Sequence, residues 1–409
     1  MSSYSSLRFR LIVNELVQGC MYGVLIAVQA LVFIEKGIPA WQLGYFLGTM
    51  GVMAALLEVP FGALADRIGR IKTYRVAICV LILSGALLLW GTHWVVLLVG
   101  IIGFGAAKAL ESGTYSAWYV ERLNENGWGD RTEKLTGQLQ ATAAFGLMIG
   151  AIGGGYLPDI AGERFGQSGT EWNLLAFFFL SILRLPVAYL VFGNKPEASH
   201  DHEAMGFGAA IKESLNNRAI REVLLLGCLV GFLMAPIETY WQPRYIEIVP
   251  NTVYSSFGWI TFGYFAMAIV GPILIGVIAG MIGLTTRWQV RVVPVVAAIS
   301  VIVLGLAQTK VTFLSGYFGF MLFFSMAGPA VFTMLNDASS DQVRATMQSL
   351  SSLTFTFGGS LAAFGLPTVF RAIGIADGWL VVAAGCGVLM VLLALFHMAG
   401  DRKSEQARE

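Results

Sequence analysis

Residues 62–72 read Gly62-Ala-Leu64-Ala65-Asp66-Arg67-Ile-Gly69-Arg70-Ile-Lys72, a polar turn between two long apolar runs. Gly62 and Gly69 permit a tight turn and a close approach between helices. Asp66 can accept hydrogen bonds from N–H groups at a neighbouring helix N-terminus. Arg70 can pair with a carboxylate on an adjacent helix. The turn can therefore act as a latch that holds one conformation; the alternative is that its basic residues only fix topology.

The composition excludes several classes of protein. Of 409 residues, 56% are hydrophobic and 12% are charged, whereas soluble domains carry about 25% charged residues. A soluble enzyme, a disordered chain and a secreted disulfide scaffold are excluded. The net charge of +1 implies no nucleic-acid partner. The four cysteines lie in apolar stretches without metal-ligand spacing, so we expect neither disulfides nor a metal site.

Apolar runs of membrane-spanning length recur along the whole chain. A helix needs about 20 such residues to cross a bilayer. Twelve runs qualify, at 12–34, 40–62, 74–92, 94–118, 136–158, 172–193, 221–243, 255–282, 290–308, 312–335, 347–370 and 377–398. The sequence therefore predicts an all-α membrane protein with twelve transmembrane helices.

The basic residues predict the orientation of these spans. With the N-terminus inside, 19 of the 26 Lys and Arg residues fall in inner segments and 5 in outer segments, which places both termini in the cytoplasm. The longest polar segment divides the chain into six spans plus six. We expect a bundle at 1–193, a linker with a short interfacial helix at 194–220, a second bundle at 221–400 and a cytoplasmic tail at 401–409.

The turn at 62–72 resembles the signature loop of the major facilitator superfamily, G-x-L-a-D-r-x-G-r-k/r, and stands after the second span as in that family. The resemblance implies two pseudo-symmetric six-helix bundles, a substrate site between them and alternating access. It implies a transporter in the cytoplasmic (inner) membrane, not an enzyme, with a small-molecule substrate and no cofactor. We expect a monomer driven by the proton gradient. The second-half counterpart, Gly280–Arg287, keeps two glycines and one Arg but lacks the Asp.

The fifth span carries closely spaced glycines at Gly146, Gly150, Gly154 and Gly155. This run looks like the antiporter motif of exporter branches, G-x-x-x-G-P-x-x-G-G, with Ala151 in place of the proline. It favours a drug or metabolite exporter that exchanges its substrate for protons. The alternative is a generic packing face, since glycines permit helices to approach closely.

Ionisable residues inside spans are costly and are candidates for function. Lys108 and Glu111 share a helix face in the fourth span at i, i+3. They can neutralise each other structurally, or they can carry protons or bind substrate. We expect Glu111 to be the first candidate for proton coupling and Glu238, in the seventh span, the second.

Other residues are candidates for the gate and the substrate cavity. Glu58, before Pro60, lies near the latch, and we expect it to have a structural or gating role. Pro236 and Pro243 predict a broken helix around Glu238, where an organic substrate can bind; an outer aromatic belt with a Glu–Arg pair is the alternative. The candidate cavity residues are Arg184, Tyr240, Trp241, Gln242, Tyr22 and Tyr264.

The sequence thus favours proton-coupled export of small organic molecules. The runner-up is a proton-coupled or facilitative importer of a small nutrient. No P-loop or metalloprotease motif supports an ATP-driven pump or an enzyme.

Overall fold

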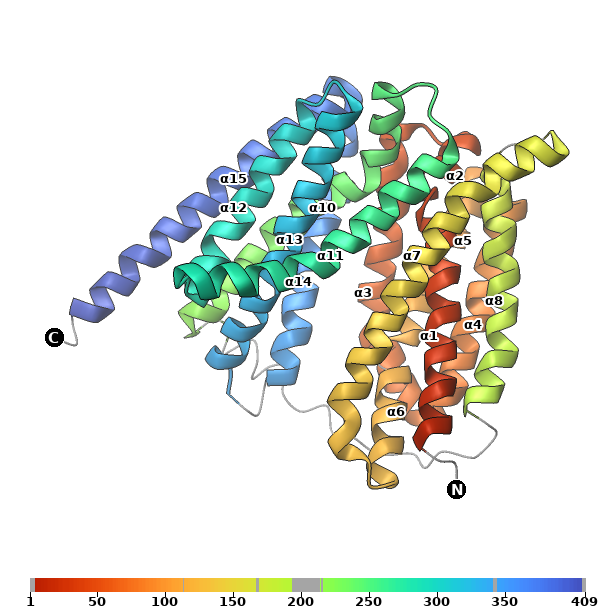
Figure 1. Ribbon diagram of the computed structural model, residues 1–409, viewed down its shortest axis with the longest axis horizontal. Helices are drawn as coiled ribbons and strands as arrows, with labels where there is room; N and C mark the ends of the chain where they lie inside the picture. The colour runs from red at the N-terminus through yellow and green to blue at the C-terminus, as the bar shows by residue number, and fades with distance from the viewer. Residues whose placement is uncertain are drawn as a thin grey trace. The chain divides into compact units, whose positions relative to one another are not determined.

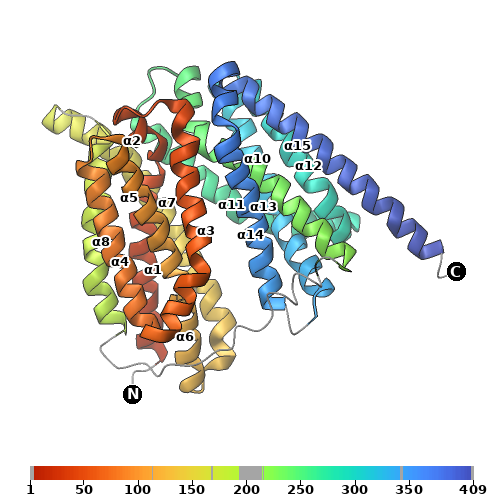
Figure 2. The ribbon, with the colours of Figure 1, turned by 180° about the vertical axis from the view of Figure 1, so that it is seen from behind.

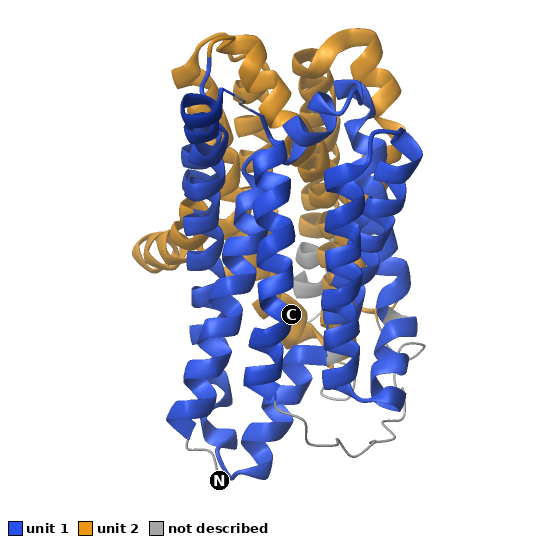
Figure 3. Cartoon of the chain, turned by 90° about the vertical axis from the view of Figure 1, so that its right-hand side faces the viewer, with its two compact units in different colours: residues 1–202, 252–265 blue, residues 203–251, 266–409 orange. Residues whose placement is uncertain are grey.

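The computed structural model describes residues 4–112, 114–166, 169–192, 214, 216–340 and 344–406. The chain divides into two compact units (Figure 3): unit 1 comprises 1–202 and 252–265, and unit 2 comprises 203–251 and 266–409. Most of the expected linker, with its interfacial helix, lies outside the described residues. The two halves expected from the sequence differ from these units in residues 252–265, which belong to the first unit.

The described part of the chain is almost entirely helical. Unit 1 contains α1 (Tyr4–Ile26), α2 (Gln29–Glu35), α3 (Leu43–Ile68), α4 (Arg70–Trp90), α5 (Trp94–Glu111), α6 (Thr114–Glu125), α7 (Thr132–Phe165), α8 (Glu171–Phe192) and the first part of α11 (Tyr254–Ile282). Unit 2 contains α10 (Arg218–Ile248), the rest of α11, α12 (Thr286–Gly305), α13 (Lys310–Ala338), α14 (Arg344–Gly365) and α15 (Pro367–Gln406). In unit 2, α12 and α15 run side by side (Figure 2).

Eleven helical segments among the described residues are long and apolar enough to cross a membrane. The expected span at 347–370 coincides with most of α14, which is not among the eleven. Its 22 residues include many Ser and Thr side chains, which lower its hydropathy. The protein is therefore an all-α membrane protein. The hydroxyl groups of α14 explain why its mean hydropathy is too low for it to count among the eleven spans.

Two expected spans are each divided into two helices. The first is interrupted at Ala27–Val28. The Val28 N–H bonds to Leu25 O, three residues back, instead of to the carbonyl four residues back as in an α-helix. The Asn173 side chain of α8 donates to Val24 O at 2.9 Å and to Gly154 O at 2.7 Å, so it supplies the donor that the break removes. The fourth span is interrupted after Glu111, where Ser112 is extended at ψ 128°. Continuous helices across 12–34 and 94–118 are thus corrected.

Glycines bring the first and fifth spans of unit 1 into backbone contact (Figure 1). A Cβ built on Gly150 or Gly154 of α7 would collide with the backbone of Cys20 or Val24 on α1. Gly23 of α1 meets the α7 backbone in the same way. Unit 2 repeats the arrangement, since a Cβ on Gly231 of α10 would collide with α14. The two units are therefore pseudo-symmetric in this respect: α1 and α7 touch through glycine in unit 1, and α10 and α14 do so in unit 2.

The first turn of α11 is fixed to unit 1 by two carboxylates. Asp159 of α7 accepts the N–H groups of Tyr254 at 3.0 Å and Ser255 at 2.8 Å, which caps this helix N-terminus. Glu35 accepts the Tyr254 hydroxyl at 2.7 Å. Gly155 and Gly258 approach each other closely enough that neither could carry a Cβ. These contacts explain why residues 252–265 group with the first unit.

Unit 2 has a buried charge cluster of its own. Arg291 of α12 donates to both carboxylate oxygens of Glu222 on α10, at 2.5 and 2.9 Å. His397 Nδ1 of α15 lies 3.3 Å from Glu222 Oε2, and Arg218 Nε lies 3.2 Å from the same nitrogen. These side chains tie three helices of the unit together.

The glycine contact between α1 and α7 yields a stability prediction. Gly150→Val should lower the melting temperature of the purified protein strongly, because the added carbons meet the backbone of α1 and overpacking typically costs about 1–3 kcal/mol or more. Gly153→Val is the matched control, since a Cβ there meets nothing within 4 Å. Equal melting temperatures for the two variants would contradict the close contact.

Candidate functional site

The candidate site is centred on a buried ion pair in unit 1. Arg184 of α8 is 0% exposed, and its Nη1 lies 2.8 Å from Glu111 Oε1. Glu111 is the last residue of α5, and its side chain is 9% exposed. A guanidinium keeps its proton at any physiological pH, so its burial requires an anionic partner close by. Glu111 is that partner.

Three further side chains complete the hydrogen bonding of this pair. The Tyr22 hydroxyl donates to Glu111 Oε2 at 3.0 Å, and Gln18 Nε2 donates to the same oxygen at 3.4 Å. Arg184 Nη2 donates to Gln18 Oε1 at 3.0 Å and to the Tyr74 hydroxyl at 2.9 Å. The site therefore joins four helices, α1, α4, α5 and α8.

Sequence reasoning missed part of this network, although a signal was present. Asn14, Gln18 and Tyr22 stand at i, i+4 and i+8 of α1, so they form one polar stripe along this helix. Asn14 Nδ2 contacts the Tyr74 hydroxyl at 3.0 Å. Glu15 of α1 lies within electrostatic reach of both Arg184 and Glu111. Polar spacing in the first span would have indicated the stripe.

Lys108 does not share the site. Its side chain is exposed, whereas its neighbours Ala107 and Leu110 are buried. Among the described residues no ion pair joins it to Glu111, whose nearest cation is Arg184. The expected i, i+3 pair is corrected for a geometric reason: Glu111 ends α5 and its carboxylate pairs with Arg184 of α8, while the Lys108 side chain is exposed.

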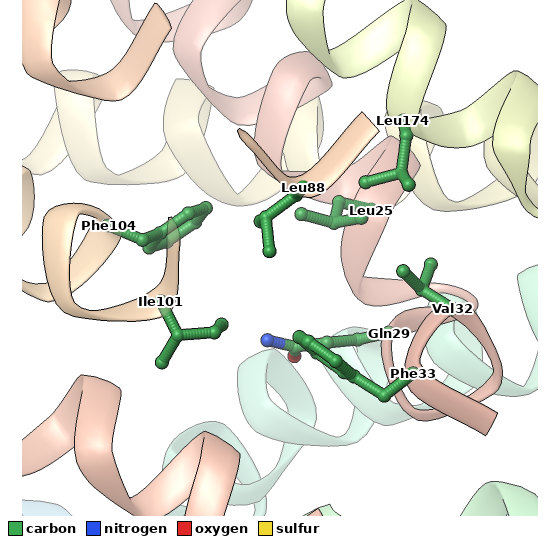
Figure 4. Close-up of a pocket in the computed structure, with 8 residues that line it drawn as sticks. All are labelled: Leu25, Gln29, Val32, Phe33, Leu88, Ile101, Phe104 and Leu174. Atoms are coloured by element: carbon green, nitrogen blue, oxygen red, sulfur yellow. The ribbon is translucent and has the colours of Figure 1, made fainter. Parts of the chain in front are cut away.

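An aromatic group and a small pocket adjoin the ion pair. Phe104 and Phe177 stack with ring centroids 5.6 Å apart, and Tyr22 lies 5.9 Å from Phe104. Phe104 also lines a pocket of at most about 250 Å³, below the roughly 300–1,000 Å³ of ligand sites. Figure 4 shows the Gln29 amide among the apolar side chains Leu25, Val32, Phe33, Leu88, Ile101 and Leu174. This pocket is too small for an organic substrate.

The candidates on α10 are placed differently from expectation. The helix runs unbroken from Arg218 to Ile248 with Pro236 and Pro243 inside it, so the predicted break is wrong. Both prolines are buried, and packed neighbours can hold a transmembrane helix together across a proline. Glu238 is exposed and lies within electrostatic reach of Tyr317.

The aromatic candidates of unit 2 mainly fill its core. Tyr240 packs on Phe370 with centroids 4.6 Å apart, and Trp241 stacks on Tyr317 at 5.1 Å. Gln242 is buried as well. Tyr264 of α11 is half-buried and meets Phe265 edge to face at 5.3 Å. As cavity residues, Tyr240, Trp241 and Gln242 are corrected, because these side chains are enclosed within their own unit.

The turn at 62–72 is linked to α6 by Arg70, which pairs with a carboxylate on another helix as the sequence predicted. Gly69 has φ 98°, ends α3 and precedes α4. Arg70 pairs with Glu121 of α6 and lies 3.7 Å from Asp66. Arg67 is exposed, and a Cβ on Gly62 meets nothing within 4 Å. Gly283, between α11 and α12, also has a positive φ of 66°, which matches the pseudo-symmetric position.

Glu58 connects this region to the charge site. Ser112 Oγ, at the break after α5, donates to Glu58 Oε1 of α3 at 3.1 Å. The break, which directly follows Glu111, is therefore held by a residue near the turn.

The buried pair yields a second stability prediction. Arg184→Gln should lower the free energy of unfolding by roughly 3–5 kcal/mol, because it leaves Glu111 buried without its counter-charge. The double variant Arg184→Gln/Glu111→Gln should recover part of this loss, measured by chemical unfolding in detergent. Arg164→Gln, at an exposed arginine of α7, is the control. Strictly additive losses in the double variant would count against the pair.

Comparison with known proteins identifies the family that the chain matches. The Major Facilitator Superfamily profile matches residues 11–363. An uncharacterised MFS-type transporter of Bacillus subtilis (strain 168), YxaM, is 25% identical over 231 residues, and this alignment spans 55% of each chain, about half the length of that relative.

Solved structures share the fold at low sequence identity. The bacterial homologue of the human lysosomal transporter Spinster, inward-facing and unoccupied, has a TM-score of 0.72 at 15% identity, over 97% of this chain and 96% of that one. The nucleoside transporter NupG has 0.75 at 14%, over 96% and 98%. The POT family transporter PepTSo has 0.78 at 12%, over 100% of both. The chain belongs to the Major Facilitator Superfamily and is a membrane transport protein rather than an enzyme.

Proposed function

We propose that this transporter exports small organic molecules by proton antiport, with both termini in the cytoplasm and the proton gradient as its energy source. The observation that carries the proposal is the Arg184–Glu111 pair, which is buried in a unit whose helices are otherwise largely apolar. A buried pair of this kind is costly to maintain and is a functional candidate by default. The glycine-rich α7 supports the exporter branch by its similarity to the antiporter motif.

A proton can act on this pair through simple electrostatics. Protonating Glu111 removes the negative charge that pairs with Arg184, and the guanidinium then needs other hydrogen-bond acceptors. The helices that carry these groups are α5 and α8, and α5 ends at Glu111. A change in the pair can therefore shift the balance between two access states, provided that these states bind the proton with different affinity. Glu238 is the second candidate for this role.

The coupling prediction concerns Glu111→Gln. This nearly isosteric amide can still accept from Arg184 but cannot exchange a proton, so pH-driven transport should be lost while substrate exchange without a gradient is partly retained. The assay uses proteoliposomes with an imposed pH gradient and ethidium, a fluorescent organic cation. Glu163→Gln, at an exposed carboxylate of α7, is the control. Undiminished pH-driven ethidium transport in Glu111→Gln would remove this residue from the mechanism.

The same vesicles separate export from import. Accumulation of ethidium on the acidic side of the membrane, from which the protons flow, supports antiport. Proton-linked or passive entry of a nutrient, such as a nucleoside or dipeptide, together with no ethidium movement, favours the importer instead.

The latch prediction concerns Asp66→Asn and Arg70→Ala. Arg70→Ala removes the ion pair between the turn and α6, and Asp66→Asn removes the charge that pairs with Arg70 within the turn. Both should change transport rates by up to about fivefold without lowering the amount of protein in the membrane, because partly exposed ion pairs contribute at most about 1 kcal/mol. Arg67→Ala removes a neighbouring exposed charge and is the matched control. If all three variants transport equally, the turn serves only as a topology signal.

A further inference from the structure

We propose that unit 2 contains a proton-binding site at His397, where a proton and the Arg218 side chain compete for one imidazole nitrogen. The ligand is the proton itself, and the site lies in the first two turns of α10 and α12 and the last part of α15. The proposal goes beyond the proposed coupling at Glu111 and does not depend on it, because the two sites belong to different units.

The His397 imidazole is enclosed and meets two oppositely charged side chains. The residue is 3% exposed. Its Nδ1 lies 3.2 Å from Nε of Arg218 and 3.3 Å from Oε2 of Glu222. Arg218 and Glu222 are four residues apart on α10, so they share the face of this helix that meets α15. One nitrogen therefore has a cationic donor and an anionic acceptor within reach at the same time.

A single nitrogen cannot serve both partners in one protonation state. A neutral imidazole with its proton on Nε2 has a lone pair at Nδ1, which accepts the Arg218 Nε–H. An imidazolium carries a proton on both nitrogens, so its Nδ1–H can donate to Glu222 but opposes the Arg218 donor. The hydrogen bond from Arg218 in the structure therefore belongs to the neutral form.

The charges around His397 make the proton and Arg218 mutually exclusive. Arg291 of α12 already donates to both carboxylate oxygens of Glu222. A proton on His397 adds a positive charge between two guanidinium groups that share one carboxylate, and uncompensated buried charge is costly. Proton binding therefore requires Arg218 to move away. Imidazole is the side chain that changes its charge between about pH 5 and 8, so this exchange falls in a physiological range.

Other charged groups on the packed helices are exposed or lie further along α15. The helix α15 packs on α10, α12 and α14. In the first two turns of α10 and α12 the other charged side chains are Arg221 and Arg287, and both are exposed. The charged residue of α14 is Arg344, which is exposed as well. Asp401 follows His397 by four residues in the sequence of α15, so it is included in the test below.

The displaced side chain is a link between two helices. Arg218 Nη2 donates to the carbonyl oxygens of Phe396 at 2.6 Å and His397 at 3.1 Å, so it joins the start of α10 to α15. The preceding residue, Asn217, caps α10 and donates to Ala338 O at the end of α13 at 2.9 Å. A proton that displaces Arg218 therefore weakens the link to α15 and leaves the link to α13 in place.

Solid-state NMR of the protein in lipid vesicles, with ¹⁵N-labelled histidine, tests the site with the proton as the probe. The chain has four histidines, and His397→Gln identifies the His397 signals. The ¹⁵N shifts distinguish the two neutral tautomers from the imidazolium. At alkaline pH the wild type should show the Nε2–H tautomer, and acid should convert it to the imidazolium.

The variants test the competition. Arg218→Gln removes the competitor, so the proton affinity of His397 should rise about tenfold, a displacement of its titration by about one pH unit. Arg221→Gln removes a neighbouring exposed arginine of α10 and is the matched control, with a smaller displacement. Asp401→Asn should titrate close to the wild type.

The outcomes separate this proposal from the coupling at Glu111. An Nδ1–H tautomer at alkaline pH would overturn the competition, and this result is read from the wild type without any variant. Equal titrations of the wild type, Arg218→Gln and Arg221→Gln would overturn it too, as would a titration that responds to Asp401→Asn and not to Arg218→Gln. Absence of a His397 imidazolium in both the wild type and Arg218→Gln down to pH 5 overturns the site itself. The vesicle assay of Glu111→Gln is independent of each of these results.

Discussion

Unit 1 is organised by the burial of one guanidinium. Arg184 has no access to solvent and cannot lose its charge, so the helices around it must provide an anion and several acceptors at once. Glu111, Gln18 and Tyr74 meet this requirement from α5, α1 and α4. Each of these side chains reaches Arg184 only if its helix presents the correct face. The ion pair thereby fixes the rotation of four helices about their axes, which the non-directional packing of apolar side chains does not.

Glycine sets the distances that this arrangement needs. The α1 and α7 backbones touch at Gly23 and Gly150, where no side chain could be accommodated, and α10 and α14 repeat the contact at Gly231. Lipid tails are as apolar as a helix surface, so close backbone packing contributes to association that the hydrophobic effect does not drive inside a bilayer. In unit 1 the polar stripe of α1 lies beside this contact. One helix thus combines rigid attachment to α7 with the hydrogen bonds to Arg184.

The sequence predicted which segments form helices better than it predicted which side chains contact each other. Apolar runs and basic residues identify spans, because hydropathy and length are local properties. The break at Val28 has no glycine or proline to mark it and depends on a donor from Asn173, more than a hundred residues away. The partner of Glu111 was missed for a similar reason: residues three apart on a helix are evident from sequence, whereas an arginine on another span is not. Pro236 and Pro243 misled in the opposite direction, because packing kept α10 continuous.

A short helix connects the charge site with the turn at 62–72. The helix α6 begins just after the break that follows Glu111. It carries Tyr115, which stacks on Tyr74 of the charge site, and Glu121, which pairs with Arg70. These two residues are six apart, which is about 9 Å along a helix axis. A helix of this length moves as one piece, so a displacement at its first turn reaches Glu121. Proton binding can favour one access state only by the difference in its affinity between the two states. If the proposed proton coupling acts at the charge site, α6 is the physical route by which that difference reaches the turn at 62–72.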